Sequence, residues 1–257
     1  MKLTFLGSGD AFVLTENNFQ SNVLIEAPNG SRLLIDCGSD IRNSLHAIGY
    51  TYSNISAVYI SHLHADHVGG LEWLGFSTFF DSRAKTPELF LHESLVDKLW
   101  DNCLSGGMAG LDEKEATLES YFKVSPLKKN FSWEGIQFEL IEMTHIFNCK
   151  EKQPCYGLFF TVGGKKFLFT SDTRFIPDTL MPYYKKADLI FHECETAPYK
   201  SGVHCHYSEL VTLPSDIKKK IWLYHYNQGS LPDAKKDGFK GYLLKQDSFD
   251  LKSSSIF

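Results

Sequence analysis

The sequence predicts an α/β fold in which stacked sheets share one polar edge. Short apolar runs typical of strands recur along the 257-residue chain, and helix-like segments lie between several of them. Several of these runs end just before histidine, aspartate or glutamate, which gathers polar side chains where the strands end. The densest example is the sequence SHLHADH at residues 61–67, which directly follows the apolar run 57–60.

The SHLHADH motif has the composition of a metal site. An HxHxDH pattern is expected by chance only about once in a thousand chains of this composition. Alternate residues of an extended segment point to one side, so His62 and His64 can hold one divalent ion together. Asp66 and His67 follow the turn into a helix and suit a second ion nearby. The alternative is a set of satisfied core or surface histidines.

The segment before the motif predicts short strands and a glycine-bearing loop. The backbone N–H groups of the loop at residues 7–11 can face an anion. Asp36 ends the last of these strands, either as a carboxylate that orients a metal ligand or as the cap of a helix at 41–48. The three strands are expected at residues 2–6, 21–27 and 32–36.

An aromatic segment and a glycine-rich segment follow the motif. Most rings of residues 73–80 are expected in the core, with one or two free to line a pocket and stack on a base. After a strand at 88–92, a helical insertion is expected at about 94–122. Glycines flank part of it, so it is a candidate lid or partner-contacting element.

Four downstream strands each end at a potential ligand or acid. This recurrence is what the metal hypothesis requires, because two ions need more ligands than the motif alone supplies. The pairs are strand 136–143 with His145, hairpin 157–170 with Asp172, strand 188–191 with Glu193, and strand 221–224 with His225.

Composition limits the class of protein. The net charge of −5 argues against a large nucleic-acid footprint. The six cysteines form no CxxC pair, which favours reduced thiols over a disulfide framework. With no long apolar run and no signal-like N-terminus, we expect a cytoplasmic protein without a membrane segment.

The order of these motifs resembles the metallo-β-lactamase superfamily. HLHADH is followed by His145, Asp172 and His225, and the resemblance covers nearly the whole chain. Within the superfamily the chain is similar to the ribonuclease Z branch of tRNA 3′-processing endonucleases. The sequences that carry this similarity are FLGSG at 5–9, LIDCG at 34–38, SDTR at 171–174, HE at 192–193 and HYS at 206–208.

The resemblance implies a fold and a ligand set. The fold is a four-layered αβ/βα sandwich, two mixed sheets with flanking helices, formed as one domain over residues 1–257. The cofactors are two divalent metal ions, zinc in the first place and manganese as the alternative. The implied ligands are His62, His64 and His145 for one ion, Asp66, His67 and His225 for the other, and Asp172 as the bridge. The implied catalytic residues are Asp66, Glu193 and His206.

Glu193 and His206 are implied as a proton relay. Cleavage of a phosphodiester expels an alkoxide that needs a proton, and a histidine held by a glutamate can supply it, typically for ~10²–10⁴-fold in rate. His204 is the rival, and Ser208 after His206 favours His206 because the branch has the same order. The alternatives are a solvated loop histidine and a salt-bridged glutamate beside the core.

The chain lacks one segment of ribonuclease Z, and this difference bears on which substrate the chain would take. That branch carries a long arm for the tRNA between the ligands that correspond to His145 and Asp172, whereas only residues 146–171 lie between them here. A phosphodiesterase core without the arm resembles the compact cyclic-nucleotide phosphodiesterases of the anti-Pycsar type, which destroy cyclic CMP and cyclic UMP. The reaction implied is hydrolysis of 3′,5′-cyclic nucleotides to 5′-monophosphates. Relatives are commonly homodimers, and the segment 104–122 is a candidate for a loop that completes the partner's pocket.

Three other functions stay open at this point. An arm-less ribonuclease Z would find its tRNA through a dimer surface. A lactonase or thioesterase is disfavoured by the Glu193 and His206 pair, which ester cleavage does not need. A catalytically silent sensor of the same fold is disfavoured by the complete ligand set.

Overall fold

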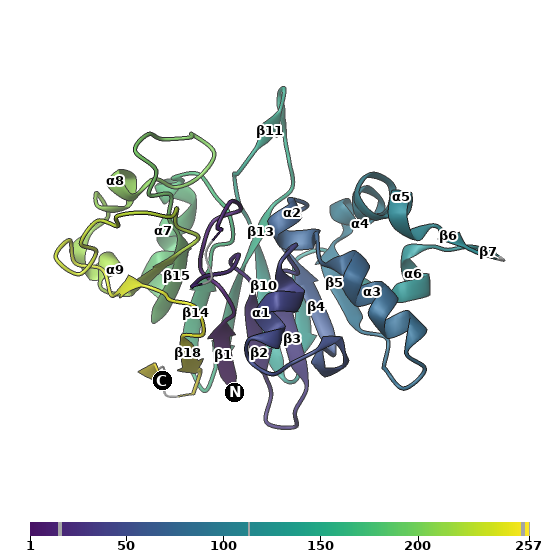
Figure 1. Cartoon of the computed structure of the whole chain (residues 1–257). Helices are drawn as coiled ribbons and strands as arrows, with labels where there is room; N and C mark the ends of the chain where they lie inside the picture. Colours follow the sequence, from purple (N-terminus) through teal and green to yellow (C-terminus); the bar gives the residue numbers. More distant parts are fainter. Residues whose placement is uncertain (15–16, 113, 253–254, 257) are drawn as a thin grey trace.

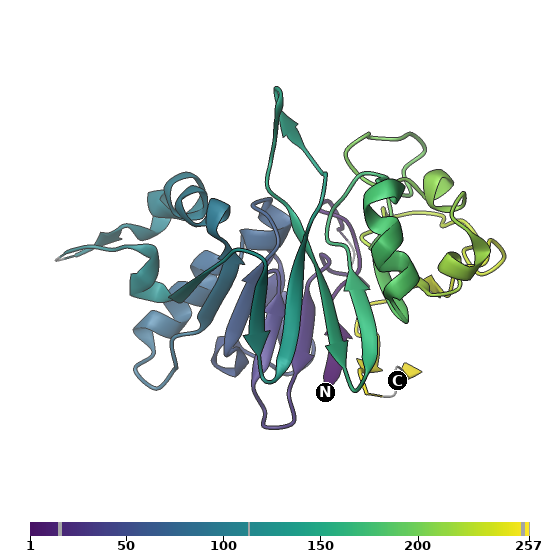
Figure 2. The same cartoon turned by 180° about the vertical axis from the view of Figure 1, so that it is seen from behind.

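The computed structural model describes residues 1–14, 17–112, 114–252 and 255–256. Two β-sheets pack face to face, and helices cover the outer face of each (Figures 1 and 2). This arrangement is the expected four-layered αβ/βα sandwich.

The first sheet is mixed. Its order over the described residues is β19-β18-β1-β2-β3-β4-β5-β8. The four strands from β3 to β8 run parallel, whereas β1 pairs antiparallel with both β2 and β18. The strands are β1 (Lys2–Phe5), β2 (Val23–Glu26), β3 (Arg32–Ile35), β4 (Ala57–Ile60), β5 (Glu88–His92), β8 (Lys123–Leu127), β18 (Ser248–Asp250) and β19 (Ser255–Ile256).

The second sheet is mixed as well, with the order β17-β16-β15-β14-β13-β10-β9 in the described part of the chain. The strands from β14 to β17 are parallel, and the other neighbours are antiparallel. The strands are β9 (Asn130–Trp133), β10 (Ile136–Glu142), β13 (Tyr156–Val162), β14 (Lys165–Phe169), β15 (Leu189–Glu193), β16 (Ile221–Tyr224) and β17 (Gly241–Tyr242).

Continuous apolar strands follow from burial on both faces. In β4, Tyr59 points into the core between the sheets, and its neighbour Val58 points to the helices outside. In β15, Phe191 packs between the sheets and Ile190 packs beneath the outer helices. Successive strand residues face opposite sides, so a strand covered on both faces is apolar throughout.

Helices of two separate groups form the outer layers. On the first sheet lie α1 (Ile41–His46), the 3₁₀-helix η1 (Tyr52–Asn54), α2 (Ala65–Val68), α3 (Leu71–Phe80), α4 (Glu93–Leu99), the π-helix η2 (Trp100–Leu104), α5 (Ser105–Met108) and α6 (Leu118–Tyr121). On the second lie α7 (Pro177–Lys186), α8 (Tyr207–Leu210) and α9 (Ser215–Lys218). None of the helices described is long and apolar enough to cross a membrane.

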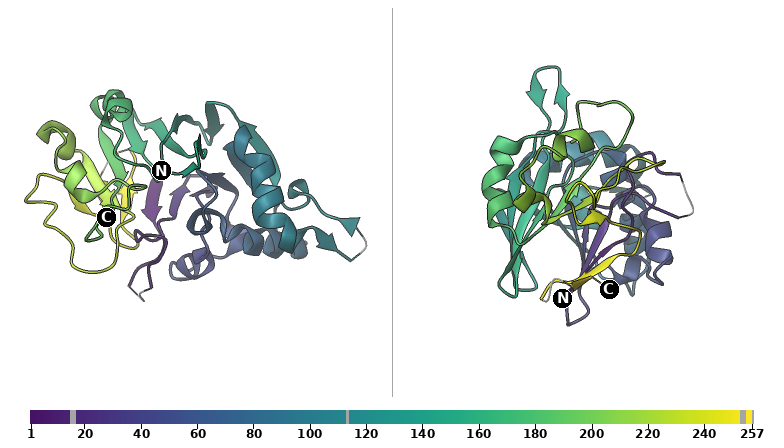
Figure 3. Two further views of the ribbon diagram at one scale, coloured as in Figure 1. Left: turned by 90° about the horizontal axis from the view of Figure 1, so that it is seen from above. Right: turned by 90° about the vertical axis from the view of Figure 1, so that its left-hand side faces the viewer.

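Two segments differ from a plain sandwich. The insertion at 94–122 is helical except for a ribbon of β6 (Gly110–Leu111) and β7 (Lys114–Glu115), which extends from the body at the end opposite α8 and α9 (Figure 3). Between His145 and Asp172, a hairpin of β11 (Phe147–Asn148) and β12 (Glu151–Lys152) precedes β13. That hairpin projects from the upper edge in Figure 1.

Strands of both sheets end at this same upper edge. β10 and the parallel strands β14, β15 and β16 all run toward it, as does β4 of the first sheet (Figure 1). The sheets are also joined there, since Tyr156 N donates to Ser61 O at 3.1 Å and His225 N donates to Ser8 O at 2.7 Å. The loops after these strands therefore meet.

Candidate metal centre

Seven side chains gather into two groups at the sheet edge. Each group brings four potential ligand atoms within 4.8 Å of one another, and Asp172 belongs to both. The first group comprises His62, His64, His145 and Asp172, and the second comprises Asp66, His67, Asp172 and His225. The structure thus brings together the seven side chains that the sequence marked as ligands.

Hydrogen bonds behind the first group determine which ring nitrogens face inward. Ser61 Oγ donates to Asp36 Oδ2 at 2.8 Å, so it accepts from His62 Nδ1 at 3.1 Å. His145 Nδ1 donates to a backbone carbonyl oxygen at 2.8 Å. The Nε2 atoms of His62 and His145 are then bare lone pairs, 3.1 and 3.2 Å from Nδ1 of His64. Converging lone pairs of this kind fit a divalent cation.

Burial keeps two of these imidazoles neutral. It holds the pKa of His62 well below its usual range and lowers the pKa of His145 to about 4. Only neutral imidazole binds a metal, so both rings are in the ligand form at pH 7.

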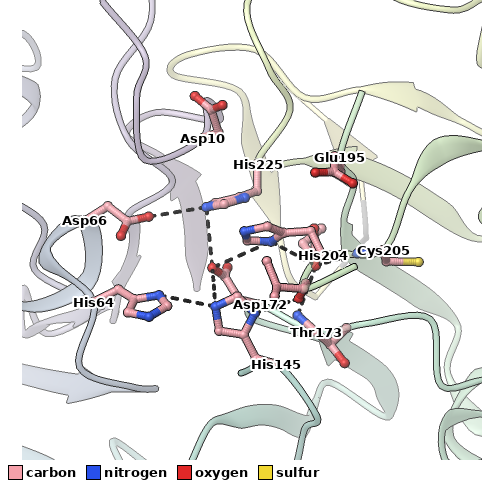
Figure 4. Close-up of polar contacts among 12 residues, drawn as sticks. Asp10, His64, Asp66, His145, Asp172, Thr173, Glu195, His204, Cys205 and His225 are labelled. Carbon is pink, nitrogen blue, oxygen red and sulfur yellow. Dashed lines mark hydrogen bonds and ion pairs between the residues drawn. The ribbon is translucent and has the colours of Figure 1, made fainter. Parts of the chain in front are cut away.

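The second group pairs imidazoles with carboxylates. His67 Nδ1 donates to Asp36 Oδ2 at 2.7 Å, so its Nε2 faces Asp66 Oδ2 at 3.1 Å and Asp172 Oδ2 at 3.4 Å. His225 Nε2 lies 3.3 Å from Asp66 Oδ2 and 3.6 Å from Asp172 Oδ2 (Figure 4). Burial alone would raise the pKa of Asp172, but His225 and His67 outweigh it and hold that pKa well below its usual range.

Two buried polar atoms in the groups lack a hydrogen-bond partner among the described residues. They are His67 Nε2, which lies near Asp66 without hydrogen-bond geometry, and Asp172 Oδ1. Buried polar atoms are rarely left unpaired, because an unpaired one costs about 1–3 kcal/mol. An unpaired nitrogen and an unpaired carboxylate oxygen within the ligand groups fit a divalent metal ion such as zinc.

Backbone turns at the strand ends aim these side chains. Asp36 after β3, Ser171 after β14 and His225 after β16 have φ of 64°, 52° and 59°, which is the left-handed region. Non-glycine residues adopt this region rarely, and such strain clusters at functional sites. The chain leaves its strand at each of these turns, and the site side chains Asp36, Asp172 and His225 lie at the turn or directly after it.

Asp36 has one of the two roles that the sequence left open. Its carboxylate accepts from Ser61 N and Ser61 Oγ, both at 2.8 Å, and from His67 Nδ1. The cap position of α1 belongs to Asp40. Asp36 therefore orients the histidines and does not cap the helix.

Glu193 meets His204, and His206 lies elsewhere. His204 Nδ1 is 3.3 Å from Glu193 Oε1 and 3.9 Å from Asp172 Oδ2. The His204 ring lies between two ligand rings, with centroids 4.8 Å from His145 and 5.0 Å from His225. Burial opposes a charge on His204, but Glu193 and Asp172 outweigh it and raise the pKa of His204 to about 10.

The expected pairing of His206 with Glu193 is not what the structure contains. His206 Nδ1 accepts from Ser208 N at 3.2 Å and lies 2.8 Å from Ser208 Oγ. Its Nε2 donates to Ala197 O at 3.0 Å. Nδ1 thus caps α8 and Nε2 is held by the loop at Ala197, so both ring nitrogens are already engaged. Ser208, which favoured His206 as the proton relay in the sequence, instead pairs with His206 in the cap of α8.

Three N–H groups of the glycine-bearing loop at 7–11 are already used within the chain and are not free for an anion. Ser8 N donates to Asn18 Oδ1 at 3.1 Å, Gly9 N to Phe19 O at 3.0 Å, and Asp10 N to Tyr226 O at 3.2 Å. The loop instead holds Asp10 above the site, where Asp10 Oδ2 accepts from Asn227 Nδ2 at 2.6 Å. Sequence reasoning missed both residues, although Asn227 follows His225 by two positions.

Known proteins match this chain over most of its length. The family model "Anti-Pycsar protein Apyc1" matches residues 1–249. The chain belongs to the Apyc1 family. An Apyc1 of Paenibacillus harenae is 36% identical over 88% of this chain and 90% of that relative. An Apyc1 of Bacillus phage vB_BveM-Goe7 is 32% identical over 88% of both chains.

Solved structures confirm the fold of this Apyc1-family chain. The metallo-β-lactamase fold protein YhfI from Bacillus subtilis has a TM-score of 0.73 at 20% identity and covers 96% of this chain and 98% of its own. The short form of human tRNase Z has a TM-score of 0.67 at 20% identity, with 98% and 99% covered. Zn(2+)-bound PqqB from Methylobacterium extorquens has a TM-score of 0.71 at 16% identity, with 98% and 100% covered. The metallo-β-lactamase fold is thereby confirmed.

Proposed function

We propose that this chain is a dinuclear metal-dependent phosphodiesterase that hydrolyses 3′,5′-cyclic nucleotides to 5′-monophosphates and so counters Pycsar-type signalling. The observation that carries the proposal is the pair of ligand groups that share Asp172, with Glu193 and His204 beside them. The substrates proposed are cyclic CMP, cyclic UMP, cyclic AMP and cyclic GMP. Membership of a family described as anti-Pycsar supports this substrate class.

The proposed cofactors are two divalent ions, zinc first and manganese as the alternative. His62, His64 and His145 would hold one, Asp66, His67 and His225 the other, and Asp172 both. A fold neighbour described as zinc-bound supports the choice of metal. Divalent ions supply Lewis-acid chemistry there, since they lower the pKa of water and neutralise charge on a phosphodiester.

His204 is our proposed proton donor, in place of His206. In the reaction, water adds to phosphorus, the P–O3′ bond breaks and O3′ takes a proton. His204 lines the cavity above the ligand groups, and Glu193 holds its Nδ1, which leaves Nε2 to give that proton. Glu193 is itself held, because its Oε1 accepts from Thr173 N and Cys205 N at 3.0 Å each. Asp66 is proposed as a metal ligand.

Three further features of the proposal rest on the composition of the sequence and on the family resemblance. We propose a cytoplasmic homodimer, with the segment 104–122 reaching the partner, and one domain over residues 1–257. The described part of that segment includes the β6–β7 ribbon, which extends from the body and supports a contact role (Figure 3).

Product analysis tests the proposed function. The metal-loaded protein is incubated separately with each of the four cyclic nucleotides and with a precursor tRNA that carries a 3′ trailer. We expect 5′-monophosphates from the cyclic nucleotides and an intact tRNA. Trailer removal with untouched cyclic nucleotides would contradict the proposal.

That contrary outcome would identify an arm-less ribonuclease Z, the second candidate. The likeness to human short-form tRNase Z favours it at the level of the fold alone. The segment 146–171 argues against it, because its described elements are one short hairpin and the sheet strands β13 and β14.

A further inference from the structure

Two exposed aromatic side chains border the cavity above the ligand groups. Phe12 is 84% exposed and Tyr199 is 73% exposed. Both line the cavity of about 560 Å³ that also contacts His204 and His225. A cavity of this size suits a small organic ligand, and exposed rings at its rim offer flat apolar faces.

The loop that carries Phe12 is anchored by hydrogen bonds at Asp10, Ala11 and Phe12 itself. Phe12 N donates to Asp10 Oδ1 at 3.2 Å, and Gln20 Nε2 donates to Ala11 O at 3.2 Å. Asp10 N donates to Tyr226 O, next to the end of β16. The backbone around Phe12 is therefore held by buried groups, while the Phe12 ring is exposed.

The loop that carries Tyr199 is anchored in the same way. Ser201 N donates to both carboxylate oxygens of Glu195, at 2.9 and 3.2 Å. Thr196 N donates to Asn227 Oδ1 at 2.8 Å. Glu195 is buried, so the base of this loop, like the base of the loop that carries Phe12, is held by hydrogen bonds to a buried side chain.

Asn227 joins the two loops. Its Nδ2 donates to Asp10 Oδ2 at 2.6 Å, and its Oδ1 accepts from Thr196 N at 2.8 Å. Figure 4 shows Asp10 and Glu195 on either side of the space above His225. The positions of the two aromatic loops are thus linked by the hydrogen bonds of one half-buried amide.

We infer that Phe12 and Tyr199 form a clamp that holds the nucleobase of a cyclic mononucleotide by stacking, with Asn227 as the residue that positions it. The inference rests on the proposed function and adds how the base is bound. Every base has a π-face, so a stacking clamp accepts purines and pyrimidines alike. The specificity of the site then comes from the ribose phosphate, and discrimination among the four bases is weak.

Steady-state kinetics of single variants test the clamp. Phe12→Ala and Tyr199→Ala are each expected to raise KM for cyclic CMP and cyclic AMP about tenfold, with kcat nearly unchanged. Phe12→Tyr and Tyr199→Phe keep a ring and should keep the wild-type KM. Leu14→Ala is the matched control, because Leu14 is 89% exposed on the same loop but does not line the cavity.

A substrate without a nucleobase distinguishes binding of the base from hydrolysis of the cyclic phosphate. We expect 1-O-methylribose 3′,5′-cyclic phosphate to be hydrolysed by the wild type with a raised KM, and that KM to be unaffected by either alanine variant. Equal KM values for this compound and cyclic CMP in the wild type would overturn the clamp. If the wild type hydrolyses none of the four cyclic nucleotides, the proposed function itself fails.

Two measurements without turnover complete the test. Calorimetric titration with 5′-CMP should give a dissociation constant about tenfold weaker for each alanine variant. Light scattering should give the same oligomeric state for wild type and Phe12→Ala. A changed oligomeric state, together with a raised KM for the base-free compound, would assign Phe12 to a subunit contact and overturn the clamp.

Discussion

His204 and His206 are separated by one residue and have different surroundings. His204 lies against Glu193 and between two ligand rings, whereas His206 caps α8. We expect His204→Ala to lower kcat about 10²–10⁴-fold with unchanged metal content, because a general acid is lost. His206→Ala should keep kcat and lose about 1 kcal/mol of stability with the cap. Kinetics, metal analysis and thermal unfolding of both variants check this.

The His204→Ala and His206→Ala variants also distinguish between the other possible roles of the two histidines. Lost turnover in His206→Ala with an active His204→Ala would restore the sequence-based assignment of the relay. Lost metal in His204→Ala would make His204 a ligand.

Asp172 is the one side chain common to both ligand groups. Its removal leaves buried imidazoles without their shared carboxylate, so Asp172→Ala should lower metal affinity and activity by about 100-fold or more. Asp178→Ala, an exposed aspartate in the first turn of α7, is the control. Metal analysis and phosphodiesterase assays check the prediction, and full activity in Asp172→Ala would refute the dinuclear proposal.

At the scale of elements, close contact between the β3–α1 loop and α2 positions Asp66. A Cβ added at Gly38 would lie 2.2 Å from the carbonyl oxygen of Asp66, which is backbone and cannot rotate away. Gly38→Ala should therefore displace α2 and cost about 1–3 kcal/mol of stability, together with metal affinity. Gly106→Ala meets nothing within 4 Å, so it should leave metal affinity unchanged and should not lower stability, since alanine favours the helix α5 that contains it.

Denaturant unfolding and metal titration of the two glycine variants check this prediction. Equal stability and equal metal affinity in Gly38→Ala and Gly106→Ala would mean that the loop and α2 adapt to the extra methyl group without cost.

At the scale of the whole molecule, the ligand groups are expected to stabilise the folded state only when metal ions are bound. Both sheets supply ligands, so a bound ion links them, and ligand binding to the folded state stabilises it by about 4 kcal/mol at a thousandfold excess over Kd. Removal of metal by a chelator should lower Tm by about 10 °C, and added zinc should restore it. Calorimetry checks this, with Asp172→Ala as a variant that should respond little. An unchanged Tm in the wild type would argue against a bound ion between the sheets.

Much of the fold follows from local pattern. The expected strands at 57–60 and 88–92 coincide with β4 and β5, because a short apolar run bounded by polar residues is typical of a buried strand. The HxHxDH spacing likewise brings His62 and His64 together within one short segment. The β6–β7 ribbon within the insertion at 94–122 is not predicted by the sequence, because its strands are too short to have a pattern of their own.

The α/β layers and the potential ligands at the strand ends follow from the sequence alone, since both depend on periodicity within a segment and on which residue follows a strand. The choice of seven of these residues as ligands comes from the family resemblance. Which histidine meets Glu193 depends instead on how distant segments pair in the folded chain. Glu195 pairs with His206 in a parallel bridge, and that register places Glu193 beside His204. Register between distant segments is set by non-local hydrogen bonds and packing, which the spacing along one segment does not encode.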